Sequence, residues 1–347
     1  MAAADEVETT LLLVGDAGWA EPDDPVLARV AAHASQRPDR TSVIFLGDNV
    51  YPDGMPVAGL EHKRAEDLLS AQLQVGRGGA QTIFVPGNHD WDNGGVNGWD
   101  EIREQGRFLE AHGSELLPAG GCPGPGVLDT GSQVRVIALD TQWWLHDHAK
   151  PQDPTSDCEA DSEAEVLAAF GDALATAGGR RVVVVGHHPL ASRGAHAGHF
   201  TWKDHIFPLR HIAGWLWLPL PIVGSLYPLI RGSGVSDQDF SNGENRHMRA
   251  ALDSVMAIHR PLIYAAGHDH SLQVFEGQTA RYFLVSGAST IGHFTPVGRD
   301  DRTRYARAGT GFMRIDFTTQ GRARLGVFAV DERGVEREEY SVWLETN

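Results

Sequence analysis

The sequence predicts an α/β fold whose sheet carries a ligand-binding site at one edge. Residues 43–46 and 83–85 are short apolar runs rich in β-branched and aromatic side chains, which is typical of buried strands. Each run meets a glycine, Gly47 or Gly87, and polar residues follow at once. Glycine lets the backbone turn sharply there, and ligand sites of open α/β sheets lie outside the carboxyl ends of strands. The two runs are therefore expected to serve one shared site.

The order of the predicted elements supports this fold class. Strands are expected at residues 9–14, 41–46, 81–85, 133–139, 182–185 and 262–266, and helices at residues 25–35, 60–75, 101–112, 157–177 and 245–259. Further strands are expected near residues 273, 281, 312, 325 and 340. Strands and helices alternate as in βαβ units. We expect a single domain over residues 1–347, with a hydrophobic insertion at about residues 200–245.

Composition narrows the class of partner. The 347 residues include 41% hydrophobic and 22% charged residues, which is ordinary for a globular protein. A net charge of −17 argues against a nucleic acid partner, because a phosphate backbone requires a basic surface. An anionic substrate would need positive charge supplied locally at its site, for example by metal ions.

The two cysteines and the N-terminus leave the compartment open. Cys122 and Cys158 lie in loop-like sequence, and no Cys-x-x-Cys spacing is present. They could form one disulfide in an exported protein or remain two thiols in a cytoplasmic one. The first residues lack the basic and apolar regions of a signal peptide, but an exported protein whose signal has been removed would look the same.

Five of the expected strand ends carry potential metal ligands. In chain order these are Asp16; Asp48 and Tyr51; Asn88 and His89; His187; and His268 and His270. Carboxylate, amide, phenol and imidazole groups suit Fe, Mn or Zn better than a metal that prefers thiolates. Their number is close to what two ions about 3.5–4 Å apart require, and Asp48 could bridge the ions. Such a pair lowers the pKa of a shared water and neutralises phosphate oxygens during attack.

Each of these residues also has a purely structural explanation. Asp16 could form a turn, Asn88 could occupy a left-handed turn, and Tyr51 could pack in the core. His187 and His188 could be one core and one surface histidine. The joint occurrence favours a metal site, because each candidate follows an apolar run and a Gly or Gly-Asp in the same sense.

The motifs resemble those of a known family. The segments Asp16-x-Gly18, Gly47-Asp48-x-x-Tyr51, Gly87-Asn88-His89-Asp90, Val184-x-x-His187 and Gly267-His268-x-His270 are similar, in this order, to the motif set of calcineurin-like metallophosphoesterases. The tyrosine at position 51 resembles the tyrosine that is typical of the purple acid phosphatase-like branch. The matches span about residues 9–270. The resemblance implies a four-layer αββα sandwich that holds a binuclear metal centre.

The resemblance also implies a role for each matching residue. In that branch the first metal is ferric iron, and its ligands resemble Asp16, Asp48, Tyr51 and His270 of this sequence. The second metal is a divalent ion (Fe, Zn or Mn), and its ligands resemble Asp48, Asn88, His187 and His268. In this arrangement Asp48 bridges the two ions. His89 resembles the histidine that contacts the phosphoryl group and assists the leaving group. A phenolate is a hard anionic donor, which agrees with a trivalent first ion.

Other residues are candidates for contact with substrate, in addition to Asn88 and His89. His188 directly follows His187, and His196 and His199 lie in a predicted loop that could reach over the phosphate. Each of these three histidines could equally serve only the structure. Asp90 could orient His89 or could cap a turn.

The leading hypothesis is a metal-dependent hydrolase of phosphate esters, specifically an acid phosphatase-like phosphomonoesterase. A metal-bound hydroxide would attack phosphorus in line, Asp48 would hold the ions together, and His89 would stabilise or protonate the departing oxygen. The substrate would be a phosphorylated small molecule or a lipid-like one. A phosphodiesterase or lipid-phosphate hydrolase is an alternative, and a scaffold that binds phosphorylated partners without turnover is another.

Residues 206–230 do not follow the strand and helix pattern. They are rich in Trp, Leu and Ile, and prolines at positions 208, 219, 221 and 228 exclude a membrane-spanning helix. The segment could fold against the domain as a hydrophobic insertion. It could also form a lid or a surface that contacts a lipid or an apolar substrate, because Trp and Tyr favour interfaces. Contact with a membrane would then be peripheral.

Overall fold

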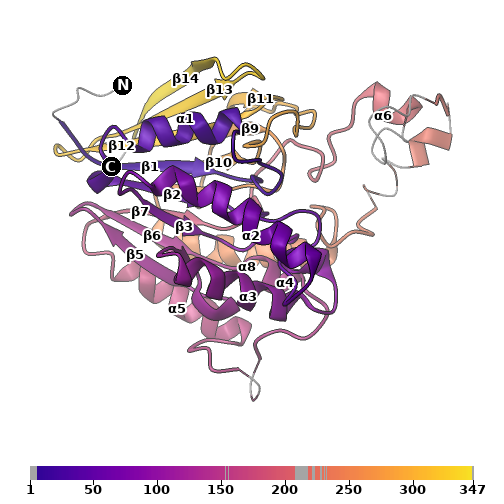
Figure 1. Ribbon diagram of the computed structural model, residues 1–347, viewed down its shortest axis with the longest axis horizontal. Coiled ribbons are helices and arrows are strands. Elements are labelled where there is room, and N and C mark those ends of the chain that lie inside the picture. Colours follow the sequence, from indigo (N-terminus) through magenta and orange to yellow (C-terminus); the bar gives the residue numbers. More distant parts are fainter. Residues whose placement is uncertain are drawn as a thin grey trace.

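Two seven-stranded sheets form the centre of the computed structural model, which describes residues 6–152, 154, 156–207, 218–220, 223–226, 229, 231 and 233–345 (Figure 1). The first sheet has the strand order β14 (Glu336–Leu344), β13 (Ala323–Val330), β12 (Gly311–Thr318), β1 (Val7–Val14), β2 (Thr41–Phe45), β3 (Gln81–Phe84) and β4 (Glu115–Leu116). The second has the order β11 (Thr303–Arg307), β9 (Leu272–Glu276), β10 (Tyr282–Ser286), β8 (Ile263–Ala266), β7 (Arg181–Val185), β6 (Val134–Ala138) and β5 (Gly126–Thr130).

Both sheets are mixed, and each has a parallel half. Strands β1 to β4 run parallel, as do β6, β7, β8 and β10, whereas the remaining neighbours are antiparallel. Strand β1 pairs with β12, so the indigo N-terminal strand lies beside the yellow C-terminal strands in Figure 1. The two ends of the chain therefore complete one sheet.

Helices cover the outer face of each sheet. On the first sheet these are α1 (Pro25–Ala34), α2 (Leu60–Leu73) and α3 (Gly98–Ala111). On the second they are α4 (Gln142–Leu145), α5 (Glu163–Ala175) and α8 (Gly243–His259). The short helix α6 (Trp202–Ile206) projects from this body in Figure 1. Single 3₁₀ turns occur at η2 (Pro38–Arg40), η3 (Gln74–Gly76), η4 (Asp92–Gly94), η5 (Ala119–Gly121) and η7 (Val223–Ser225).

Three buried apolar clusters hold the four layers together. Leu11 and Leu13 of β1 point into the cluster between the two sheets, whereas Leu12 and Val14 point into the cluster under the helices. The second sheet alternates in the same way, with a third cluster against α5 and α8. Both faces of each sheet are covered, which explains why the strands read as continuous apolar runs. The predicted αββα sandwich is confirmed.

The strands that the sequence pattern missed are β4, β5 and β11, and each of them lies at the edge of a sheet. An edge strand pairs on one side only, and β5 alternates between half-buried and exposed residues. Such a strand lacks the continuous apolar run that marked the central strands. The predicted helices are all present, with ends that differ by a few residues.

Much of the predicted hydrophobic insertion lies outside the described residues, including positions 208–217, 221–222, 227–228, 230 and 232. The hypotheses of a lid and of membrane contact, and the single-domain prediction, therefore stay predictions. Within the part of the chain that the structure describes, no helix is both long and apolar enough to span a membrane. Residues 236–242, at the end of the insertion, are described and fold against the candidate site.

A disulfide joins Cys122 to Cys158, with a Cα–Cα distance of 5.7 Å and a sequence separation of 36 residues. It connects the loop before β5 to the segment before α5. This pairing decides between the disulfide and the two free thiols that the sequence left open.

Removal of this disulfide should lower the free energy of unfolding. Closing a loop of this length restricts the unfolded chain by about 3–4 kcal/mol, so a C122S/C158S variant should unfold at lower temperature and lower urea concentration. Thermal and urea melts with and without reductant measure the effect. Reductant should destabilise the parent protein and leave the variant unchanged; equal midpoints for the two proteins under oxidising conditions would contradict the prediction.

Candidate metal centre

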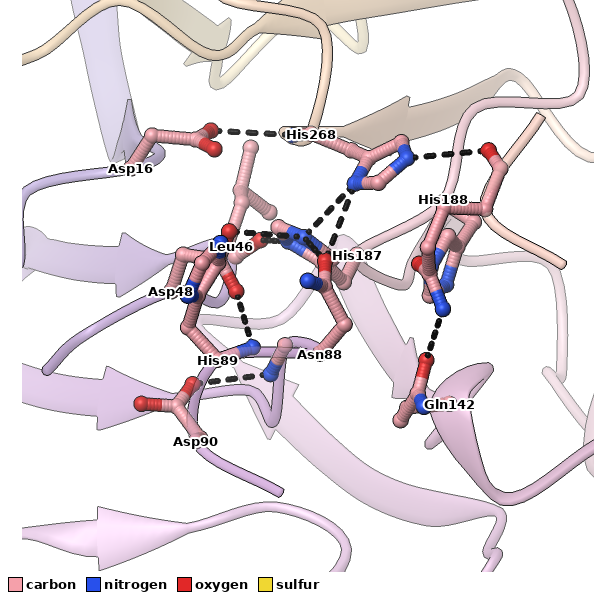
Figure 2. A network of polar contacts seen from close by, with 12 residues as sticks. Asp16, Leu46, Asp48, Asn88, His89, Asp90, Gln142, His187, His188 and His268 are labelled. Carbon is pink, nitrogen blue, oxygen red and sulfur yellow. Dashed lines mark hydrogen bonds and ion pairs between the residues drawn. The ribbon is translucent and has the colours of Figure 1, made fainter. Parts of the chain in front are cut away.

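The predicted ligand-bearing residues meet where loops leave the carboxyl ends of parallel strands in both sheets (Figure 2). The loops after β1, β2 and β3 carry Asp16, Asp48 with Tyr51, and Asn88 with His89. The loops after β7 and β8 carry His187, and His268 with His270. Apart from His89 and His270, which are partly buried, these side chains are buried. The site therefore draws on both halves of the sandwich.

Three of these residues occupy the left-handed backbone region. The φ angles are 58° at Asp16, 53° at Asp48 and 66° at His268. Residues with a Cβ rarely adopt this region, and each instance costs on the order of 1 kcal/mol or more. The conformation turns each residue abruptly out of its strand. Strained backbone of this kind concentrates at functional sites, where the surrounding structure enforces it.

One group of ligand atoms surrounds the phenol of Tyr51. The Tyr51 Oη lies 3.2 Å from Asp16 Oδ1, 2.9 Å from Asp48 Oδ2 and 3.2 Å from His270 Nε2. His270 Nε2 in turn lies 3.2 Å from Asp16 Oδ1. These four side chains are the ones that the resemblance assigned to the first metal.

A second group surrounds the side-chain oxygen of Asn88. Asn88 Oδ1 lies 3.1 Å from both His187 Nε2 and His268 Nδ1, and these two nitrogens are 3.2 Å apart. His187 Nε2 also lies 3.3 Å from Asp48 Oδ2. The same oxygen of Asp48 therefore borders both groups, as a bridging ligand would.

The spacing and chemistry of these atoms fit two metal ions. Ligands at about 2.0–2.2 Å from one ion in octahedral or tetrahedral geometry lie about 2.8–3.6 Å from one another. The separations above, 2.9–3.3 Å, fall in this range. Two buried carboxylates and several acceptor atoms face one another, which is unfavourable unless a cation lies between them. Oxygen and imidazole donors without thiolate suit Fe, Mn or Zn.

Backbone carbonyls orient two of the histidines. His187 Nδ1 donates a hydrogen bond of 2.8 Å to the carbonyl of Leu46, and His268 Nε2 donates one of 3.1 Å to the carbonyl of Gln238. Each ring is thereby fixed as the tautomer whose other nitrogen faces the centre. A Cβ added at Gly87 would lie 2.2 Å from Asp48 N and 2.3 Å from its Oδ1. Glycine is thus required where the third loop passes the shared carboxylate.

In the metal-free protein, two of these side chains hold protons firmly. Burial disfavours the charged ring of His187, but the carboxylates of Asp48 and Asp16 outweigh it and raise its pKa to about 9. Burial and the same carboxylates raise the pKa of Tyr51 well above its usual value. Burial and the neighbouring His196 and His188 lower the pKa of His268, so that ring is neutral. A cation must therefore displace protons from His187 and, if it binds the phenolate, from Tyr51.

His89 lies at the edge of the centre with its ring partly exposed. Its ring packs against Tyr51 with centroids 4.3 Å apart, and its Nδ1 donates to the carbonyl of Pro52, whereas its Nε2 has no hydrogen-bond partner among the described residues. Its backbone N–H donates to Asp48 Oδ1 at 2.9 Å. Asp90 instead accepts backbone hydrogen bonds from Gly87 and Asn49, so it fastens two loops together and serves as a cap.

The three further histidines occupy different environments. His188 is fully buried, with Nδ1 at 2.8 Å from Thr141 Oγ1 and Nε2 donating to Gln238 Oε1 at 2.7 Å, so both ring nitrogens are engaged. This arrangement favours a supporting role for His188. His196 lies over the second group, with its ring centroid 3.9 Å from that of His268. His199 packs against Gly298 and, among the described residues, makes no hydrogen bond to a predicted ligand.

Two residues that the sequence did not single out also contact Tyr51. His293 has its ring centroid 5.3 Å from that of Tyr51 and 3.9 Å from that of His270, and its buried Nδ1 has no hydrogen-bond partner among the described residues. Trp19 stacks on Tyr51 at 5.5 Å and remains 41% exposed. His293 lies in the loop after β10, which ends at Ser286 and is followed by Gly287. This repeats the pattern of a strand followed by a glycine that marked the predicted ligands. Trp19 carried no comparable signal.

Metal uptake by the metal-free protein should become tighter as the pH rises. Displacing one proton from His187 should increase the apparent affinity about tenfold per pH unit between about pH 6 and 8. Release of the Tyr51 proton would make the dependence steeper. Titration calorimetry or equilibrium dialysis with Mn²⁺ or Zn²⁺ at several pH values measures this slope. An affinity that does not change with pH would contradict the assignment of His187 as a ligand.

Comparison with known proteins agrees with the motifs and the fold. A family model for calcineurin-like phosphoesterases matches residues 9–272. A search of curated proteins finds no match. A dimetal phosphatase from Danio rerio is 14% identical, with a TM-score of 0.57 and coverage of 99% of this chain and 100% of that chain.

Two further solved structures are similar over nearly the whole chain. GAP50, the anchor in the inner membrane complex of Plasmodium, is 14% identical with a TM-score of 0.59, and the match covers 99% of this chain and 90% of that chain. A purple acid phosphatase from yellow lupin (Lupinus luteus) is 12% identical with a TM-score of 0.58, and the match covers 96% of this chain and 53% of that chain. At these identities the likeness concerns the fold alone. The family match spans well over half of the sequence, and the chain therefore belongs to the calcineurin-like phosphoesterase family.

Proposed function

We propose that this protein hydrolyses phosphomonoesters with a binuclear metal centre of the purple acid phosphatase type. The observation that carries the proposal is the position of Asp48, whose Oδ2 lies 2.9 Å from Tyr51 Oη in one ligand group and 3.3 Å from His187 Nε2 in the other. Two ions held there would activate a water as the nucleophile and neutralise the phosphoryl oxygens. The substrate is a phosphorylated small molecule.

The chain contributes orientation and proton transfer. The paired loops hold the ligand atoms in place through strained backbone and buried hydrogen bonds, so little reorganisation is needed when substrate binds. His89 Nδ1 donates to the carbonyl of Pro52, so Nε2 can donate to the departing oxygen when the ring carries a second proton. His196 is positioned by Asp239 and Arg231 beside His268, and it can contact a phosphate oxygen.

The first ligand group suits ferric iron. Tyr51 Oη is surrounded by two carboxylates and one imidazole, and a phenolate in this setting is a hard donor that favours a trivalent ion. The second group, with an amide oxygen and two imidazoles, suits a divalent ion.

The disulfide bears on the compartment. Disulfides persist in oxidising environments and are rare in the cytosol, so the pairing of Cys122 with Cys158 supports an exported protein.

An Asp48→Asn substitution should reduce the rate of hydrolysis of an aryl phosphate by at least about 1,000-fold, because the variant loses the shared anionic ligand. Hydrolysis of p-nitrophenyl phosphate and the metal content of the purified protein measure the effect, with thermal melts as a check on folding. An Asp39→Asn variant, which changes an exposed carboxylate, is the control and should match the parent protein. Full activity of Asp48→Asn would refute the proposal, and a metal-loaded parent without turnover would favour the binding scaffold.

A Tyr51→Phe substitution tests the identity of the first metal. If the phenolate binds Fe(III), the oxidised protein should absorb visible light through charge transfer from Tyr51, and the variant should lose that band. Absorption spectra recorded together with iron analysis measure this. A colourless parent protein that is fully active with zinc or manganese would contradict the ferric assignment and would leave the hydrolase assignment intact.

A further inference from the structure

A cavity of about 330 Å³ lies beside the candidate metal centre. It is lined by Val50, Tyr51, Pro52, Asp53, Gly54, Pro56, Glu61, Arg64, Ala65, Asp92 and Glu101. Tyr51 belongs both to this wall and to the first ligand group, and Pro52 accepts the hydrogen bond from His89. The cavity therefore adjoins the histidine that we assign to the leaving group.

The cavity is acidic. Four carboxyl groups line it, those of Asp53, Glu61, Asp92 and Glu101, against the single guanidinium of Arg64. That guanidinium is already engaged, because it lies 3.5 Å from Glu61 Oε2 and stacks over the ring of Trp19 at 5.0 Å. The remaining charge favours a positively charged occupant.

Glu101 supplies an independent reason to expect a ligand. This residue of α3 is only 4% exposed, lines the cavity, and its Oε2 has no hydrogen-bond partner among the described residues. A Cβ added at Gly54 would lie 2.7 Å from that oxygen, 2.9 Å from the carbonyl oxygen of Asp90 and 3.0 Å from that of His89. Three oxygens thus gather around the bare α-carbon of Gly54. A buried acceptor without a donor is costly, and a cation would relieve that cost.

The electrostatic environment agrees with this. Burial and the nearby carboxylates of Asp92 and Asp53 raise the pKa of Glu101 to about 8. The carboxylate is therefore destabilised when the cavity holds no cation, and a positive charge would stabilise it.

The shape of the cavity favours an organic cation over a bare metal ion. Among the described residues, groups of three acidic, histidine or cysteine side chains with ligand atoms within 4.8 Å of one another occur only at the metal centre. The carboxylates of this cavity are more widely spaced, and Val50, Pro56 and Ala65 add apolar wall between them. Dispersed negative charge and apolar surface suit a quaternary ammonium group, which is large and weakly hydrated.

We propose that this cavity binds the ammonium group of the substrate, so that the preferred substrates are phosphomonoesters of amino alcohols. The phosphate would lie at the metal centre, and the alkyl chain would pass His89 and Pro52 to place the ammonium near Glu101 and Asp53. This inference rests on the proposed phosphomonoesterase function and specifies its leaving group.

The test compares two esters that differ only in charge. Phosphocholine and its neutral isostere, in which carbon replaces the quaternary nitrogen, have the same shape. The metal-loaded protein should hydrolyse phosphocholine with a kcat/KM at least about tenfold higher than that of the isostere. Glu101→Gln should reduce the ratio to about one, and Asp53→Asn, at an exposed position, should reduce it in part. Glu110→Gln, an exposed position at the other end of α3, should keep the ratio of the parent protein.

Direct binding separates the two proposals. Choline, which has no phosphate, should bind the metal-loaded parent protein in titration calorimetry and should bind Glu101→Gln at least about tenfold more weakly, whether or not turnover occurs. Absence of p-nitrophenyl phosphate hydrolysis with choline binding intact would refute the phosphatase and keep the cation site. Hydrolysis with equal rates on the two esters and no choline binding would overturn the cation site alone. Binding of Ca²⁺ that depends on Glu101, without binding of choline, would overturn the organic ligand.

Discussion

The constraint on which this structure depends is the burial of negative charge at one point between two sheets. Asp16 and Asp48 are almost completely inaccessible to solvent, and Tyr51 and Asn88 add further oxygens beside them. Such a cluster would push itself apart unless cations or protonated histidines compensated it. The carboxylates raise the pKa of His187 and of His270, so these two rings can provide that compensation without a metal, and the same nitrogens are the ligands that we propose. The site can therefore remain folded in both states.

The sandwich architecture holds this cluster together. Hydrogen bonds cross from one sheet to the other directly beneath the site: His187 donates to the carbonyl of Leu46, and Ser286 Oγ donates to the carbonyl of Leu13. The apolar cluster between the sheets sets their separation, so strands remote in sequence deliver ligand atoms to within about 3 Å of one another. The left-handed residues that end β1, β2 and β8 use this rigidity, because a softer scaffold would relax their backbone.

The end of the insertion is part of the support for the centre. Gln238 accepts hydrogen bonds from His268 through its backbone and from His188 through its side chain, and Asp239 fixes His196 together with Arg231. Trp19 and His293 contact the ring of Tyr51, and Tyr51 also lines the acidic cavity. The candidate metal centre is thus built from residues at the ends of regular strands, whereas its surroundings come from irregular segments. Differences in substrate among proteins of this fold are expected to arise in those segments.

The sequence alone determined the α/β class, the central strands and the set of residues that converge, because buried strands leave apolar runs and each site residue follows such a run and a glycine. It also indicated Asp48 as the shared residue. Only the tertiary structure decided the pairing of Cys122 with Cys158, the contact of His188 with Thr141 and the contacts of Trp19 and His293 with Tyr51. It also revealed the buried Oε2 of Glu101, which has no hydrogen-bond partner among the described residues. These features depend on which segments meet in space, and no local pattern of residues records such meetings.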